Sequence, residues 1–459
     1  MHDSPPIERH RSLGQRDVVM YTVSAILLLE TLTAAASIGA AAIFWWLFLG
    51  VVFFLPFALI CAEMGCTYPE QGGIYAWVRD AFGGRWGARA SWGYWVNTAV
   101  WLPAIYILFA GIFAQLYAPG LSLAGQIAIG IGLTWLTVGL NVVTLDVGKW
   151  VPNLGAAVKV LVFLTLIGAA SYHVATQGFA NPINLETIRP TWSDSVAFIP
   201  AIIYGMLGFE LVSASSEEIK NPRRNVPRGI LISGLIIISL YTLATTAMLA
   251  ALPADEIDLV EGLVATLHQF FASSGAGEII VSILGAGALY TFFTNGVTWA
   301  MGCNRAAAEA GIEGELPRFF ALETRRGTPL GAAVVMGAFS TGVLLLYGGL
   351  ASNSEDLFWS LFAFSAVIFL LPYLGLTLAF LHARRHDAGR HRPFAVPGGM
   401  AIARTCAYVC FAALAASIGL FIYTPGEGIV HPVLWGALVT LAIGELTIRF
   451  GEHHPVRAG

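Results

Sequence analysis

Three ionisable side chains lie in segments of the sequence that are otherwise apolar: Glu30, Lys159 and Glu210. The run around Glu30 extends from Val18 to about Ala62 and contains no other charge. A charged group in hydrocarbon costs about 2.5–3.5 kcal/mol on insertion scales, so it is expected to face a cavity or a partner. Carboxylates can bind ammonium groups or carry protons, and burial makes a lysine release its proton more readily. The pattern predicts binding and proton exchange inside a membrane, with a purely structural ion pair as the alternative interpretation of Glu30 and Lys159.

The composition places the chain among integral membrane proteins. It is 57% hydrophobic and 11% charged, whereas a soluble domain carries about 25% charged residues. The 50 glycines fit this class, because glycine lets helices approach closely in lipid. No basic tract interleaved with aromatic residues occurs, which argues against nucleic acid as a partner.

The cysteines and histidines show no spacing typical of an enzyme or a metal site. The five cysteines lie in or beside apolar segments without disulfide or metal-ligand spacing, so we interpret them as small core residues. The ten histidines form no pattern such as HExxH, and no nucleophile motif or ATP-binding loop occurs. We therefore expect no enzyme activity, no cofactor and no bound metal, and any transport must be driven by an ion gradient or by exchange.

Twelve apolar segments are long enough to span a membrane as helices. They cover residues 18–37, 42–65, 90–117, 122–143, 151–174, 194–216, 228–252, 277–303, 329–349, 356–383, 402–423 and 430–450. Of the 24 lysines and arginines, only Arg189 lies on the outer side of this arrangement and only Lys159 lies deep within a span. The excess of positive charge on the other side places both termini in the cytoplasm, with the protein in the plasma (inner) membrane. The cytoplasmic tails are then residues 1–17, too polar for a cleaved signal peptide, and 451–459.

The sixth span contains two closely spaced glycines, Gly205 and Gly208, in the sequence YGMLGFE. Such a pair weakens a helix, and a broken helix in a membrane is tolerated only against protein or a cavity. A break would free the carbonyl groups of residues 204–208 and create a helix N-terminus near Glu210. Free carbonyls attract an ammonium group and a helix N-terminus attracts a carboxylate, so together they form a clamp for an amino acid. Tight packing of the glycines against a neighbouring helix is the alternative.

The first span lacks such a glycine pair, and its candidate break is the stretch of small and hydroxyl-bearing residues from Ser24 to Thr33. We expect substrate-binding residues in both segments. They are Ser24, Glu30, Thr31, Tyr204, Gly205, Gly208, Phe209 and Glu210.

Two charges near the ends of spans have simpler interpretations. Glu63 ends the second span and is expected to reach the membrane interface. Glu445 lies four residues before Arg449, a spacing that places both side chains on one helix face and predicts an ion pair.

Several loop motifs resemble those of the amino acid–polyamine–organocation superfamily of transporters. The run YPEQGGIYAWVRDAFGGRWG (68–87) is similar to the loop after the second helix of that family. The runs EEIKNPRRNVPRGI (217–230), which follows a GFE-like element, and NRAAAEAGIEGELPRFFA (304–321) are similar to the loops after the sixth and eighth helices. The segment AALPADEIDLVEGLVATL resembles the bacterial glutamate/GABA antiporter branch. The resemblance covers roughly residues 15–450.

The resemblance implies an all-α, LeuT-like fold with two inverted five-helix repeats in residues 18–383, a cytoplasmic loop at 384–401 and two further helices in 402–450. The predicted topology permits this, because the first and sixth spans run in opposite directions with five helices between their starts. In the family, helices 1 and 6 are discontinuous and the substrate lies between them. The fifth-helix lysine of some proton-coupled members, which occupies the place of a sodium ion in relatives, resembles Lys159 and implies a role in proton coupling. The glycine-rich break that many members have in helix 1 has no counterpart between Tyr21 and Ile38.

We therefore expect a secondary transporter of amino acids or related amines that works by alternating access, as a proton-coupled symporter or an exchanger. A polyamine or cationic amine permease of the same fold is an alternative, and a channel or a transporter-like sensor is the alternative of another class. Two carboxylates in one cavity, Glu30 and Glu210, favour a substrate with extra positive charge, unless one carboxylate is protonated. The expected partners are a small-molecule substrate, protons and membrane lipid, and nothing in the sequence indicates an oligomeric state.

Overall fold

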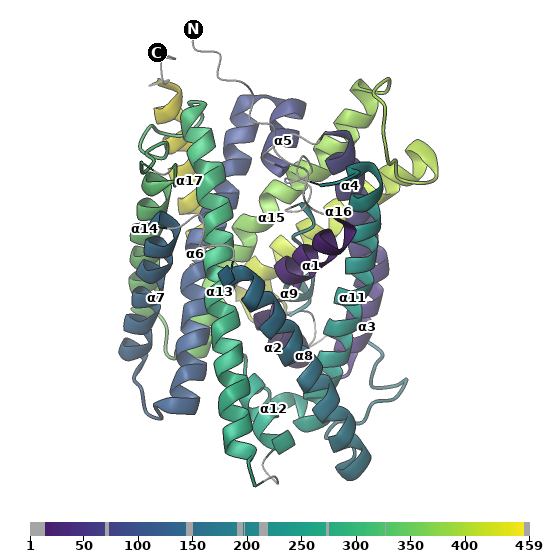
Figure 1. Cartoon of the computed structure of the whole chain (residues 1–459), viewed down its shortest axis with the longest axis vertical. Coiled ribbons are helices and arrows are strands. Elements are labelled where there is room, and N and C mark those ends of the chain that lie inside the picture. Colours follow the sequence, from purple (N-terminus) through teal and green to yellow (C-terminus); the bar gives the residue numbers. More distant parts are fainter. Residues whose placement is uncertain are drawn as a thin grey trace.

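A computed structural model describes residues 14–453, apart from 69–72, 144–149, 191–195, 197, 211–218, 272–274 and 326. The described chain is almost entirely helical, and its long helices run side by side in one bundle (Figure 1). Within these residues the only strands are β1 (Tyr423–Thr424) and β2 (Gly428–Ile429), which form a short antiparallel hairpin.

The helices follow one another along the chain, and the longer connections include those between α8 and α9 and between α13 and α14. The first half of the chain contains α1 (Gln15–Ile26), α2 (Glu30–Ala36), α3 (Ala41–Leu49), the π-helical η1 (Gly50–Phe54), α4 (Leu55–Thr67), α5 (Ile74–Phe82), α6 (Gly84–Tyr117), α7 (Leu123–Val143), α8 (Trp150–Gln177) and α9 (Ile199–Tyr204). The second half contains α11 (Pro222–Ala251), the short 3-10 helix η4 (Ala254–Glu256), α12 (Gly262–Phe271), α13 (Gly277–Ile312), α14 (Leu330–Gly348), α15 (Ser354–His386), α16 (Gly399–Ile422) and α17 (His431–His453).

Ten stretches of the described chain are long and apolar enough to cross a membrane. They coincide with the predicted second to fifth and seventh to twelfth spans. The predicted first span is occupied by α1 and α2, with residues 27–29 between them. The predicted sixth span contains α9, and its residues 194, 195, 197 and 211–216 lie outside the described part of the chain. The chain is therefore a multi-pass helical membrane protein.

Local sequence explains where several helices begin and end. Asn353 precedes α15, and its side-chain oxygen accepts a hydrogen bond from the Asp356 N–H at 2.8 Å, which caps the helix. The short helix α5 lies between Gly73 and Gly83, whose φ angles of 52° and 91° belong to the left-handed region that glycine adopts most easily.

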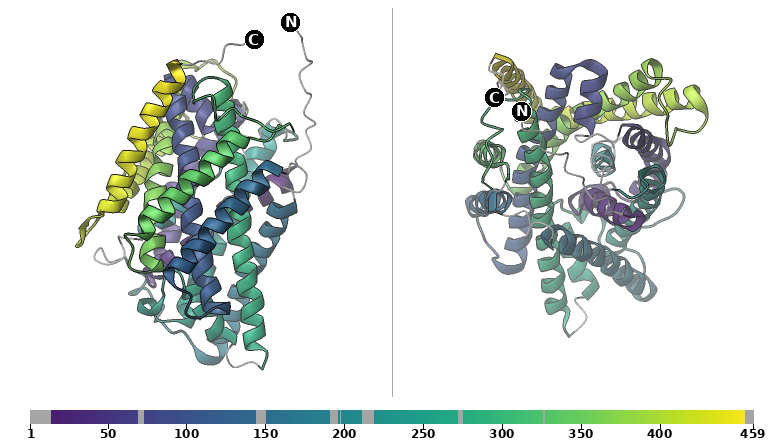
Figure 2. Two further views of the ribbon diagram at one scale, coloured as in Figure 1. Left: turned by 90° about the vertical axis from the view of Figure 1, so that its left-hand side faces the viewer. Right: turned by 45° about the horizontal axis from the view of Figure 1, so that its top comes forward.

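The core of the bundle is built around α6 and α15. In each of these helices 78% of the most apolar stretch is buried inside the protein, against 28% for α7 and α17. The outer helices leave their remaining apolar surface for lipid, and α17 lies along the outside of the bundle (Figure 2). Gly93 lets α6 approach α15 closely, because a Cβ atom there would lie 3.1 Å from the ring of Pro372. The two central helices therefore hold the residues between them in fixed positions.

Candidate substrate-binding site

The backbone between α1 and α2 is held by a tyrosine from another helix. Tyr241 of α11 donates a hydrogen bond to the Ile26 carbonyl at 2.8 Å and accepts one from the Leu28 N–H at 2.7 Å. Trp46 of α3 stacks on the Tyr241 ring, with 4.3 Å between centroids and 8° between planes. The Tyr241 hydroxyl thus supplies hydrogen-bond partners to backbone groups that have none within α1 or α2. Buried backbone groups require such partners. Sequence reasoning missed Tyr241, because nothing local marks it as a partner of residues 200 positions earlier.

Glu30 is the first residue of α2 and is only 1% exposed. Neither of its carboxylate oxygens has a hydrogen-bond partner among the described residues, and the same is true of the Trp101 indole N–H of α6. The Trp101 N–H acts on the Glu30 carboxylate as a weak donor that does not reach hydrogen-bond geometry, and Lys159 acts on it through its charge. A buried carboxylate without a hydrogen-bond donor is costly, so this arrangement is suited to receiving a charged or hydrogen-bonding ligand.

Lys159 of α8 is buried and donates a hydrogen bond from Nζ to Asn295 Oδ1 of α13 at 2.8 Å. No salt bridge within 4 Å joins it to Glu30 in the described chain, although the two charges interact at longer range. The helices are very close at Gly155, one turn before Lys159, where a Cβ atom would lie 2.2 Å from Thr294 Oγ1. This close approach fixes the amine at the interface of α8 and α13.

The chain is not helical between α9 and Glu210. Helix α9 ends at Tyr204, residues 205–209 form turns and extended backbone, and Glu210 is helical again. Gly208 has a φ of 127°, which a residue with a side chain adopts only with strain. A Cβ atom on Gly205 would lie 3.0 Å from Thr31 Oγ1, so glycine permits α2 and this segment to meet. The two irregular segments, 27–29 and 205–209, are therefore neighbours.

Glu210 is buried and only partly paired. The hydroxyl groups of Tyr373 on α15 and Tyr94 on α6 donate hydrogen bonds to its Oε1 at 2.6 Å and 3.1 Å. Its Oε2 has no hydrogen-bond partner among the described residues. One oxygen is thus held in place, while the other retains its capacity to accept a hydrogen bond.

Aromatic rings from four helices contact one another between the neighbours of Glu210 and those of Glu30. Trp299 of α13 contacts Tyr94, Trp101 and Phe369, with centroid distances of 6.0, 6.1 and 5.8 Å. Phe369 of α15 also contacts Tyr204, the last residue of α9, at 5.3 Å. The faces of such rings attract organic cations. This aromatic wall was not predicted, although the seven-residue spacing of Tyr94 and Trp101 is a sign that they share one helix face.

A cavity of about 740 Å³ lies at one end of α15, and its lining includes the carboxylates of Glu355, Asp356 and Glu427. Phe198 and Trp359 also line it, with their rings 5.0 Å apart. The aromatic contacts continue inward from Trp359 to Phe362 at 5.8 Å and from Phe362 to Tyr204 at 4.9 Å. A column of rings therefore separates this acidic cavity from Tyr204.

The predicted site residues are only partly brought together in the described structure. Glu30, Tyr204, Gly205 and Glu210 surround or adjoin the aromatic wall. Thr31 instead donates hydrogen bonds to the Leu28 carbonyl at 3.1 Å and to Tyr241 at 3.2 Å, and Phe209 packs on Phe54 at 4.6 Å. These two residues support the irregular segments. Ser24 lies in α1, and its side chain is outside the described part of the structure.

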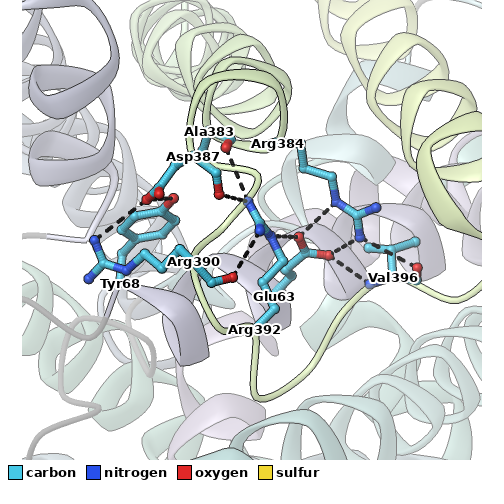
Figure 3. Close-up of polar contacts among 8 residues, drawn as sticks. All are labelled: Glu63, Tyr68, Ala383, Arg384, Asp387, Arg390, Arg392 and Val396. Atoms are coloured by element: carbon cyan, nitrogen blue, oxygen red, sulfur yellow. Dashed lines mark hydrogen bonds and ion pairs between the residues drawn. The ribbon is translucent and has the colours of Figure 1, made fainter.

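Glu63, at the end of the predicted second span, is 1% exposed, and hydrogen-bond donors surround its carboxylate (Figure 3). Its Oε1 accepts hydrogen bonds from Arg384 Nε at 2.8 Å and Arg392 Nε at 3.1 Å. Its Oε2 accepts from the Val396 N–H at 2.7 Å and from Arg384 Nη2. The side chain is buried because the loop after α15 folds back over α4 and brings two arginines to the carboxylate.

The same loop is held a second time at Tyr68, which follows α4. The Tyr68 hydroxyl donates to Asp387 Oδ2 at 3.0 Å, and the Arg390 guanidinium lies 4.4 Å from the centre of its ring (Figure 3). Burial, together with the hydrogen bond to Asp387, raises the pKa of Tyr68 to about 12, so the hydroxyl remains a donor at neutral pH. We call Glu63, Arg384, Arg392 and Val396 the Glu63 cluster.

The predicted ion pair between Glu445 and Arg449 is present. Arg449 Nε lies 3.4 Å from Glu445 Oε1, and Arg89 of α6 also contacts this carboxylate at 3.1 Å. The prediction of a helix-face pair is confirmed, and the second arginine ties α17 to α6.

Long apolar helices that enclose buried charges and an aromatic wall define a membrane transport protein. The chain belongs to the amino acid permease family, whose model matches residues 13–443, and thus to the superfamily that its loop motifs resemble. It is a transporter of amino acids or related amines.

Three relatives illustrate the range of the family. A probable agmatine/putrescine antiporter of Lactococcus lactis subsp. lactis (strain IL1403) is 31% identical over 440 residues, 94% of this chain and 93% of that protein. An uncharacterized transporter of Legionella pneumophila subsp. pneumophila is 30% identical over 391 residues, 83% of each chain. A glutamate/gamma-aminobutyrate antiporter of the same Lactococcus strain is 24% identical over 82% of this chain and 77% of that protein.

Proposed function

We propose that the protein exchanges a cationic amine across the plasma membrane by alternating access, with the substrate held between Glu30 and Glu210. In this proposal α1 and α2 are two halves of the first of twelve spans, and α9 and Glu210 lie on either side of a break in the sixth. The ten long helices, the two irregular segments and the membership of the family support the inverted-repeat arrangement. Both termini are then cytoplasmic.

The observation that carries the substrate class is the pair of incompletely bonded carboxylates beside aromatic rings. Glu30 has two oxygens without a partner and Glu210 has one, among the described residues. An organic cation supplies what both lack: ammonium or guanidinium N–H donors for the oxygens and positive charge for the ring faces. A substrate with two positive ends satisfies both carboxylates at once. This agrees with the agmatine/putrescine antiporter among the relatives.

Lys159 is the proposed coupling residue. Its amine is buried, bonded to Asn295 and within electrostatic reach of Glu30. A change in the charge of the lysine therefore alters the field at the carboxylate that receives the substrate. Loss of its proton would leave Glu30 free to bind a cation, and its protonation would compete with that cation for the same carboxylate.

An exchange assay in proteoliposomes tests this function. Vesicles are loaded with unlabelled agmatine or putrescine and given the same compound in labelled form outside. We expect accumulation that depends on the internal amine, with glutamate and GABA as weak competitors. Accumulation driven by glutamate or GABA instead would support the amino acid alternative, in which one carboxylate is protonated, and a flux that is independent of internal substrate would support a channel.

Gly208→Leu separates the proposed site from the fold around it. The φ of 127° makes any side chain strained at this position, and a Cβ atom would lie 3.0 Å from Ile26 Cγ1. We expect exchange to be abolished in folded protein, as judged by its elution profile in detergent. Gly132→Leu on α7 is the control, because a Cβ atom there meets nothing within 4 Å. Normal exchange by the Gly208 variant would contradict the site assignment.

A further inference from the structure

Asn97 of α6 is a buried amide that no described contact explains. The residue is 2% exposed, and its Oδ1 atom has no hydrogen-bond partner among the described residues. Buried polar side chains are paired in the large majority of cases. An unpaired amide oxygen in the protein interior destabilises the fold unless another molecule supplies the donor. Such an atom is a candidate ligand contact where its position also places it at the binding site.

The position of Asn97 identifies that ligand as the transported cation. Tyr94, Asn97 and Trp101 are separated by three and four residues, so they lie on one face of α6. Tyr94 is bonded to Glu210, and Trp101 lies within interaction distance of Glu30. At the rise of an α-helix, Asn97 lies about 4.5 Å from the level of Tyr94 and about 6 Å from that of Trp101. It is therefore placed between the two carboxylates along the proposed site.

We infer that Asn97 determines specificity by accepting a hydrogen bond from an N–H in the interior of a dication whose ends meet Glu30 and Glu210. This rests on the proposed function. A diaminoalkane has only methylene groups between its two ammonium ends, and these cannot donate to Oδ1. A guanidinium carries additional N–H groups on the chain side, and a secondary ammonium carries them in the middle of the chain. Asn97 accordingly favours guanidino-amines and polyamines with a secondary amine over simple diamines.

The test compares the affinity of two ligands in three variants. Asn97→Leu keeps the branching and the number of side-chain heavy atoms without the acceptor, Asn97→Asp keeps an oxygen at the same place, and Ser91→Ala is the control. Ser91 is also buried on α6 with an unpaired hydroxyl, but it lies six residues from Asn97 on the far side of Tyr94. Apparent KM values for agmatine and putrescine are measured by exchange, and binding is measured by the ligand-induced rise in Tm of solubilised protein.

We expect Asn97→Leu to raise the KM for agmatine about tenfold, because one hydrogen bond to a charged group is lost. The KM for putrescine should rise less than about threefold. Asn97→Asp retains the preference for agmatine, and Ser91→Ala leaves the ratio of the two KM values unchanged. An unchanged ratio in Asn97→Leu overturns the inference while leaving the proposed function intact. If Asn97→Leu does not fold, Asn97→Asp decides, because a loss of preference in a folded variant with the oxygen present overturns it. Wild-type protein that binds neither amine overturns the proposed function as well.

Discussion

Glu30 and Glu63 are buried to the same extent, each 1% exposed, yet they are bonded in opposite ways. Four donors from two arginines and a backbone N–H meet the oxygens of Glu63. The oxygens of Glu30 meet none among the described residues. Burial alone therefore does not distinguish a carboxylate that is fully paired from one that can still accept hydrogen bonds from a ligand. The supply of hydrogen-bond donors does, because a saturated carboxylate has no capacity left for a ligand.

The two carboxylates also differ in what they connect. Glu63 joins α4 to the end of α15 and to the loop that follows it, so it fixes one end of the bundle (Figure 3). Glu30 begins a helix beside two irregular segments, where the backbone itself is held by Tyr241. A fully paired carboxylate such as Glu63 stabilises one fixed arrangement of the helices that it joins. In the proposed function, a carboxylate without hydrogen-bond partners lies where the bound substrate changes during each transport cycle.

The largest effect is expected from Glu63→Gln. This change removes the only carboxylate of the Glu63 cluster and leaves two buried guanidinium groups facing an amide. Breaking such a pair costs about 3–5 kcal/mol of folding free energy. We expect a large fall in Tm and loss of folded protein in detergent. The control is Glu445→Gln, which affects an ion pair that is about one third exposed and should change Tm little. A Glu63 variant as stable as wild type would contradict the interpretation of Glu63 as a structural carboxylate.

Glu30→Gln should have the opposite effect to Glu63→Gln: transport should be impaired while the stability of the fold is retained. The amide keeps the size of the side chain and removes a buried charge without a donor, so Tm should be unchanged or raised. With a cationic substrate the apparent KM for agmatine or putrescine should rise about tenfold or more, equivalent to roughly 1.4 kcal/mol. An unchanged KM with a shifted pH optimum would instead mean that the carboxylate acts in its protonated form. If neither changes, Glu30 is a structural partner, and its openness has no functional meaning.

Lys159→Ala sharpens the comparison by removing the nearest positive charge to Glu30. We expect uptake to lose its dependence on pH while substrate binding persists, because the proposed coupling amine is gone. Asn295→Ala keeps the amine but removes its 2.8 Å hydrogen bond, and should shift the pH profile without flattening it. Uptake measured across a range of external pH in proteoliposomes distinguishes these outcomes. An unchanged pH profile in Lys159→Ala would move coupling to Glu30 or Glu210.

The sequence predicted the long helices well, because length, apolarity and the distribution of arginine are properties of each segment. Ten predicted spans coincide with helices of the structure. It also identified Glu30, Lys159 and Glu210 as buried, because a charge in an apolar run has few alternatives. The family assignment followed from loop motifs that are local in the same sense, and the match over residues 13–443 confirms it.

Contacts between distant segments could not be predicted in this way. Tyr241 and Asn295 are ordinary residues in apolar helices until tertiary packing places them at residue 28 and at Lys159. The pairing of Glu63 depends on a loop more than 300 residues later in the chain. Asn97 shows the opposite case, because the feature that singles it out is the lack of a partner for Oδ1 among the described residues, and this too depends on the tertiary structure.

The smallest effect is expected at Glu315, a carboxylate of intermediate character outside the apolar spans. It follows α13, is half-buried and interacts with the Tyr75 hydroxyl, while its Oε2 atom has no partner among the described residues. Its neighbour Glu313 is better paired, accepting hydrogen bonds from Tyr75 at 2.6 Å and from Arg79 at 3.1 Å. The two residues thus repeat the contrast of Glu30 and Glu63 at the surface, where water reduces every charge effect.

The pH dependence at this position has a definite sign. Burial raises the pKa of Glu315 above its ordinary value of 4.5, so the folded protein binds this proton more tightly than the unfolded chain does. Stability is then greatest at acid pH and falls as the pH rises from 4.5 through the higher folded value. Glu315→Gln removes that loss and should raise the stability at neutral pH by at most about 0.5 kcal/mol, as is usual near the surface. Glu313→Gln should lower stability instead, because it removes a paired charge. Tm measured at acid and neutral pH for both variants checks the prediction, and equal shifts of one sign would show that hydrogen-bond supply does not rank the carboxylates of this protein.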